Sequence, residues 1–252
     1  MVLDFQDLFE NAVVLDIAEE IKTLCEDLGI PIVSSAKELN SDSIVIFAAY
    51  HKNYDTEPQE IKEILLQKLN SCDKKTILGF EFYSDKFFED LLNDQTRNLH
   101  DINTYLLRLK FRKTIRGLLK VFNEIQQKYA RDRFEIRVFG GTYAESVERQ
   151  KAADMGDREK VKEYDEKWDV QIVKRILDLL KTYGDDNLVF YTGMAHVVDL
   201  LTKLKEIIES GNKDEIKINN IVVFLTPRDQ SLSDYEQRKL ELLDDFIGNI
   251  RK

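Results

Sequence analysis

Hydrophobic positions along this chain follow two patterns that alternate. Short uninterrupted apolar runs are typical of buried strands, and they lie at residues 44–50, 76–81, 134–139, 188–192 and 218–225. Between these runs, apolar residues recur at intervals of three and four, which predicts helices. The predicted helices cover residues 5–28, 57–70, 84–93, a stretch that ends near 183, 196–209 and 231–250, with one long helix or a helical hairpin over 100–130.

This regular alternation of strands and helices predicts an α/β fold. A mostly parallel central sheet of about five strands, with helices on both faces, accommodates such an order. The length suits a single α/β domain over residues 1–252, with a helical insertion at about 84–130. A charged segment at about 145–167 is interpreted either as a flexible loop or lid or as a solvated helix, and helix is favoured for its second half.

Composition narrows the classes of partner. The net charge of -10 and the pI of about 5.0 argue against nucleic acid and anionic membranes, which require a basic face. The basic residues of 108–120 are interpreted as the solvated face of a helix. Apolar runs long enough to span a membrane and the features of a signal peptide are both missing. Cys25 and Cys72 lack metal or redox spacing, so a cytoplasmic protein with reduced thiols is expected.

Three candidate functional residues follow predicted strands. His51 and Glu81 stand at the ends of the runs 44–50 and 76–81, and His196 follows 188–192 after a short turn. The carboxyl edge of an open parallel sheet is where ligands bind, so we expect these side chains to form one site there. Strand alternation directs Tyr50 to the opposite face, so it is not assigned to the site. Structural alternatives are a strand cap for His51, a helix cap for His196 and a buried ion pair for Glu81.

The expected environments of these residues suit proton transfer or metal binding. His196 falls in the first turn of a helix, where the helix dipole lowers the pKa of an imidazole and favours its neutral form. Glu81 lies among aromatic residues, and desolvation raises the pKa of an unpaired carboxyl group there, as in a general acid or base. Two imidazoles and a carboxylate, His51, His196 and Glu81, are also a recurrent ligand set for a divalent metal.

At these residues the chain resembles the superfamily of erythromycin esterases, haem-uptake ChaN proteins and Tiki/TraB proteins. Its members show a strand ending in Gly-Glu-x-His, a strand ending in a Glu flanked by apolar residues, and a late strand-Gly-x-x-His-helix. The matching segments here are Ala48-Ala49-Tyr50-His51, Leu78-Gly79-Phe80-Glu81-Phe82-Tyr83 and Gly193-Met194-Ala195-His196. The resemblance spans roughly residues 40–200.

Two further segments enter through this resemblance. Tyr164-Asp165 is the nearest match to an Arg-Asn or Arg-Asp element of the superfamily, which makes Asp165 a candidate catalytic residue at the same edge. Arg137-Val138-Phe139-Gly140 is similar to a strand that ends in Gly-x-Asp, with Thr142 in place of the Asp. The chain departs from the pattern at Ala49, which replaces a glutamate, and at Tyr164, which replaces an arginine.

Two functions are therefore expected as alternatives. The first is a hydrolase, esterase-like or peptidase-like, in which Glu81 activates a water molecule, with a divalent metal held by His51 and His196 as an option. The second is a catalytically silent binding protein on the same scaffold, because Ala49 stands where the superfamily has a carboxylate. Its ligand would be a small molecule, haem or a protein partner. The sequence leaves the substrate, the metal and the oligomeric state open.

Overall fold

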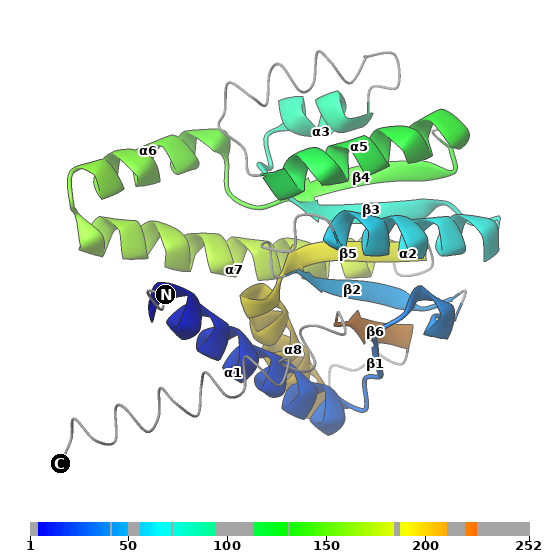
Figure 1. The fold of residues 1–252 in the computed structure, drawn as a ribbon, viewed down its shortest axis with the longest axis horizontal. Coiled ribbons are helices and arrows are strands. Elements are labelled where there is room, and N and C mark those ends of the chain that lie inside the picture. Colours follow the sequence, from blue (N-terminus) through cyan, green and yellow to red (C-terminus); the bar gives the residue numbers. More distant parts are fainter. Residues whose placement is uncertain are drawn as a thin grey trace.

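The described part of the chain is built around one sheet of six parallel strands (Figure 1). The computed structural model describes residues 5–40, 42–49, 56–71, 73–93, 113–130, 132–183, 187–210 and 220–225. The strands are β1 Ile32–Val33, β2 Ile44–Ala49, β3 Thr76–Glu81, β4 Phe134–Phe139, β5 Asn187–Gly193 and β6 Ile221–Phe224. Their order across the sheet is β1-β6-β2-β5-β3-β4, and every neighbouring pair is parallel.

Helices cover both faces of this sheet. In the described residues they are α1 Phe5–Leu28, α2 Glu57–Ser71, α3 Lys86–Asn93, α5 Lys113–Lys128, α6 Tyr143–Asp154, α7 Arg158–Tyr183 and α8 Met194–Glu209, with a 3-10 turn at Ala36–Glu38. The α/β class with a parallel sheet and helices around it is therefore confirmed. None of these helices combines the length and the apolar character needed to cross a membrane.

The sheet has six strands rather than about five. The additional strand, β1, contains only Ile32 and Val33, and among the described strands it pairs with β6 alone. Two residues are too few to give a period of hydrophobic positions, so the sequence pattern does not reveal this strand. Pairing with Val223 and Phe224, a contact between distant parts of the chain, is what makes the segment a strand.

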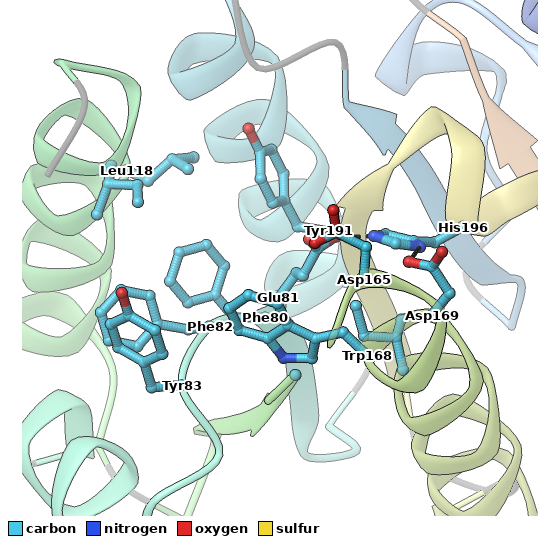
Figure 2. A pocket seen from close by; sticks show the side chains of 13 residues that line it. Phe80, Glu81, Phe82, Tyr83, Leu118, Asp165, Trp168, Asp169, Tyr191 and His196 are labelled. Atoms are coloured by element: carbon cyan, nitrogen blue, oxygen red, sulfur yellow. Dashed lines mark ion pairs between the residues drawn. The ribbon is translucent and has the colours of Figure 1, made fainter. Parts of the chain in front are cut away.

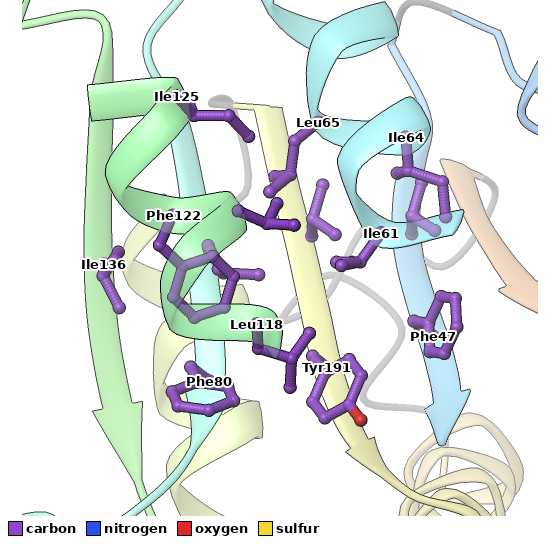
Figure 3. Close-up of a cluster of buried hydrophobic side chains, with 14 of the residues drawn as sticks. Phe47, Ile61, Ile64, Leu65, Phe80, Leu118, Phe122, Ile125, Ile136 and Tyr191 are labelled. Atoms are coloured by element: carbon purple, nitrogen blue, oxygen red, sulfur yellow. The ribbon is translucent and has the colours of Figure 1, made fainter. Parts of the chain in front are cut away.

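Two hydrophobic cores lie on opposite faces of the sheet. On one face, α2 and α5 pack over the central strands, where Phe122 of α5 lies edge-on to Phe80 of β3 and Leu65 of α2 belongs to the same core (Figure 3). On the other face, the core joins the sheet to α1, α7 and α8. Cys25 of α1 is buried in this second core, and burial raises the pKa of its thiol to about 12. The strands read as continuous apolar runs because both of their faces are buried.

The charged segment at 145–167 is helical over almost its whole length. Thr142 caps α6 through a reciprocal capping box with Glu145, and the chain turns at 155–157, where Gly156 has a φ of 73°. It then enters α7, which packs against α6. The predicted helix in the second half of the segment is confirmed. The first half is also helical, so the alternative of a flexible loop is wrong. In Figure 1 this hairpin projects beyond the carboxyl edge of the sheet.

Some predicted features lie outside the described residues. They are the helix at 231–250, residues 100–112 of the helical insertion, and the segment 50–55 that carries Tyr50 and His51. Cys72 lies outside as well. The predicted boundaries of the described elements agree with the structure to within a few residues, and α1 agrees at both ends.

Candidate functional site

Three neighbouring strands, β2, β5 and β3, end at the edge of the sheet where the sequence predicts the site. β5 lies between β2 and β3, so the strands that precede His196, His51 and Glu81 are adjacent and parallel, as expected. Ala49, the last residue of β2, is paired with Gly193 at the end of β5. His51 itself lies outside the described residues. The connections also diverge here, because β3 leads to α3 on one face and β5 leads directly into α8 on the other. Such a divergence opens a crevice at the strand ends.

Glu81 joins β3 to the end of β5. Its Oε2 accepts one hydrogen bond of 2.7 Å from the Thr192 hydroxyl and another of 2.7 Å from the Gly193 backbone N–H. Its Oε1 lies 3.5 Å from Nε2 of His196, which is an ion-pair separation. Four-fifths of the Glu81 side chain is shielded from solvent, since its exposed fraction is 20%. The carboxylate is therefore fixed in orientation and faces the imidazole.

His196 lies between two carboxylates. Its Nδ1 is 3.4 Å from Oδ1 of Asp169, and this buried nitrogen has no hydrogen-bond partner among the described residues. Burial alone lowers the pKa of His196, but the bond to Glu81 and the charges of Glu81, Asp169 and Asp199 outweigh it, so the pKa is raised. The expected lowering by the helix dipole is wrong in sign, because the carboxylates are closer and carry full charges.

Asp169 is a site residue that sequence reasoning missed. Desolvation is the largest effect on Asp169 and raises its pKa. His196 opposes this increase, and repulsion from Asp199, Asp165 and Glu81 adds to it, so the pKa is raised. The available signal was helical spacing, because Asp169 lies one turn after Asp165 and residues four apart share a face. Asp165 does line the same cavity, but its carboxylate is held by Arg149, with Nη2 to Oδ2 at 3.0 Å.

A cavity of about 410 Å³ opens beside this group of charged residues. In Figure 2, Phe82 and Tyr83 lie on one side of it and Asp169 and His196 on the other, with Trp168 between them. The remaining walls come from β3, β5, α5, α7 and the residue after β4, namely Phe80, Glu81, Ile115, Leu118, Gly140, Asp165, Ile172 and Tyr191. Its volume is in the range of small-molecule sites, and aromatic walls with a few convergent polar groups are typical of them.

Tyr191 is fixed in the cavity wall by a second buried carboxylate. Its hydroxyl donates a 2.7 Å hydrogen bond to Oε2 of Glu57, at the start of α2. Burial, and then the charge of Glu57, raises the pKa of Tyr191 well above its ordinary value. The phenol therefore stays neutral, and its hydrogen bond ties the start of α2 to the cavity wall.

Two glycines make room for Trp168 and for the neighbouring strand. A Cβ at Gly141 would lie 1.8 Å from Nε1 of Trp168, so the indole packs directly on the backbone there. Gly140 has a φ of 146°, and a Cβ on it would lie 2.5 Å from the carbonyl oxygen of Phe82. The close approach of Trp168 and of the Phe82 backbone therefore accounts for the Gly-Gly pair after β4.

Two residues that the resemblance singled out, Tyr164 and Thr142, do not line the main cavity. Tyr164 instead borders a small hollow with Lys167 and Glu145. Thr142 caps α6. Among the described residues, no group of three or more His, Cys, Asp or Glu side chains is arranged to hold a metal ion. The predicted ligand set includes His51, which is not among them.

Comparisons with known proteins do not assign a family. No protein-family model matches the chain, and neither a curated protein nor a solved structure matches it. The resemblance to the esterase, ChaN and Tiki/TraB superfamily therefore rests on the order and spacing of three short motifs and stays a prediction.

Proposed function

We propose that this protein is a hydrolase that acts on an ester or amide bond held in the cavity beside Glu81. The observation that supports this most is the row of Asp169, His196 and Glu81 at the cavity wall, with separations of 3.4 and 3.5 Å. Shielded groups that influence each other's protonation are typical of sites that transfer protons. The superfamily resemblance points to the same class of reaction.

The proposed roles follow from charge. Glu81 takes the proton of the attacking water while the water oxygen bonds to the carbonyl carbon. Glu81 and Asp169 raise the pKa of His196 against the lowering by burial, which favours the imidazolium, and this form stabilises the negative charge that develops on the carbonyl oxygen. The proton on Glu81 then passes to the leaving oxygen or nitrogen as the bond to carbon breaks. Thr192 and Gly193 hold Glu81 in place through these steps.

Activity measurements on matched variants test this proposal. The purified protein is screened with p-nitrophenyl esters and peptide nitroanilides, and active substrates are repeated with Glu81→Gln, His196→Gln and the control Asp178→Asn, an exposed carboxylate of the same helix as Asp169. We expect the first two variants to lose roughly 100-fold or more in kcat/KM and the control to keep it. Equal turnover in all three folded variants, or no turnover of any substrate by the wild type, contradicts the proposal.

A divalent metal at this site remains a prediction from the sequence. If His51, Glu81 and His196 share an ion, calorimetric titration with Zn²⁺ or Mn²⁺ shows one site per chain, and His51→Ala abolishes it. Haem, bound through His51 or His196, is the weaker expectation from the sequence. A Soret band that is lost in His196→Ala is the corresponding measurement.

A binding protein on the same scaffold is the second candidate. One observation favours it: both hydrogen bonds to Glu81 Oε2 stabilise the junction between β5 and α8, so the carboxylate has a structural task without any chemistry. Saturable ligand binding with no turnover, which persists in His196→Gln, is the expected result for this alternative.

A further inference from the structure

The cavity beside Glu81 has an excess of negative charge. Three carboxylates line it, from Glu81, Asp165 and Asp169, and the only basic side chain among its described lining residues is His196. Arg149 reaches Asp165 from α6 and neutralises one of the three. After this pairing, two carboxylates, Glu81 and Asp169, face one imidazole, so an excess of negative charge remains even when His196 is protonated. The net charge of the chain, -10, has the same sign.

The rest of the lining is aromatic rather than polar. Trp168 stands next to Asp169 on α7, and Tyr83 and Phe82 face them from the segment after β3 (Figure 2). The faces of aromatic rings attract organic cations, with Trp the strongest, and this attraction grows where water is excluded. A metal ion gains nothing from such rings, since it requires oxygen, nitrogen or sulfur ligands.

We infer that the ligand of this cavity is an organic ammonium ion that carries an apolar or aromatic group, held by Asp169 and the face of Trp168. This names the substrate class of the proposed hydrolase and rests on that proposal for the reaction, but the binding itself does not depend on it. Asp169 is the carboxylate assigned to the cation because its side chain is 45% exposed, against 20% for Glu81, while Arg149 occupies Asp165.

Matched ligands test the charge preference. Phenethylamine, 2-phenylethanol and phenylacetate have the same aromatic body and carry a positive, zero and negative charge. We expect calorimetry to give phenethylamine a dissociation constant roughly tenfold below that of the alcohol, and phenylacetate the weakest binding. Equal binding of amine and alcohol, or tighter binding of phenylacetate, overturns the inference. A tripeptide with a central lysine and capped ends competes with phenethylamine if the ammonium belongs to a peptide, and does not if it belongs to a small molecule.

Side-chain variants test the assigned contacts. Trp168→Leu removes the aromatic ring, so we expect its affinity for phenethylamine to fall roughly tenfold. Trp168→Phe keeps an aromatic ring, so we expect a smaller loss. We expect Asp169→Asn to weaken the binding of phenethylamine and to leave the binding of 2-phenylethanol unchanged. The control Asp178→Asn is expected to change neither affinity. Loss of amine and alcohol binding to the same extent in Asp169→Asn contradicts a charge contact.

The two proposals fail separately. Tight amine binding without turnover of any ester or amide supports this inference and contradicts the hydrolase. Turnover of neutral esters at the same kcat/KM as amine-bearing esters supports the hydrolase and overturns the ammonium preference.

Discussion

His196 shows how neighbours decide the chemistry of a single residue. Its position in the first turn of α8 favours a neutral ring, yet Glu81 and Asp169 lie 3.5 and 3.4 Å from its two nitrogens. Two full charges at these distances outweigh the partial charge of a helix end. The residue is therefore better suited to stabilise negative charge than to act as a neutral base.

The raised pKa of His196 predicts a pH-dependent contribution to stability. Because the folded-state pKa lies above the unfolded value of about 6.5, the stabilisation is fully present below that unfolded pKa. It is lost as the pH rises through the folded-state pKa. We therefore expect the unfolding free energy of wild type to exceed that of His196→Gln by a margin that is complete below about pH 6.5 and shrinks as the pH rises from there through the folded-state pKa.

Urea denaturation across this range measures the margin. NMR titration of His196 in Glu81→Gln complements it and is expected to give a lower pKa than in wild type, since the main group that raises it has lost its charge. A margin independent of pH, together with an unchanged titration, shows that the carboxylates do not hold the charge. Asp178→Asn serves as the control.

Gly141 offers a second residue-scale prediction. Gly141→Ala places a methyl group where the Trp168 indole lies, so we expect a loss of about 1–3 kcal/mol in unfolding free energy. In a Trp168→Ala background the same substitution meets open space and costs much less. A double-mutant cycle by chemical denaturation measures the coupling. Additive effects would show that the indole does not pack on Gly141.

At the scale of elements, α7 builds one wall of the cavity through helical spacing. Asp165, Trp168, Asp169 and Ile172 recur at intervals of three, four and seven, and so share one face of the helix. The same helix forms a hairpin with α6, joined by Arg149 to Asp165 and by Lys167 to Glu145. Lys167 and the Thr142 backbone lower the pKa of Glu145 to about 2. The orientation of the wall therefore depends on ion pairs between the two helices.

Arg149→Met tests that dependence. We expect faster amide hydrogen exchange over Tyr143–Asp154, while the global unfolding free energy falls by less than about 1 kcal/mol, because both partners are about one-third or more exposed. Lys162→Met is the control, since its partner Glu166 lies on the same helix. Unchanged exchange in α6 would show that packing alone holds the hairpin.

For the whole molecule, both hydrophobic cores share the same six strands. If the helices on one face detach, the apolar side chains on that face of the strands become exposed and the sheet that supports the other core is weakened. We therefore expect the chain to unfold as one unit, in accord with the predicted single domain. Trp168, the one tryptophan of the sequence, reports on the cavity by fluorescence, and far-ultraviolet circular dichroism reports on the helices. Coincident urea transitions from the two signals support one unit, and separate transitions contradict it.

The sequence by itself determined the α/β class, the order of five strands and most helices, because each depends on the local period of apolar residues. It also placed Glu81 and His196 at strand ends, since position along the chain is enough for that. Only the tertiary structure decided that β5 lies between β2 and β3, that β1 is a strand, and that Asp169 faces His196 while Arg149 occupies Asp165. These are contacts between segments that are distant in sequence, and no local pattern of residues encodes them. The direction of the pKa shift of His196 likewise depends on its distances to Glu81 and Asp169, which only the folded structure determines.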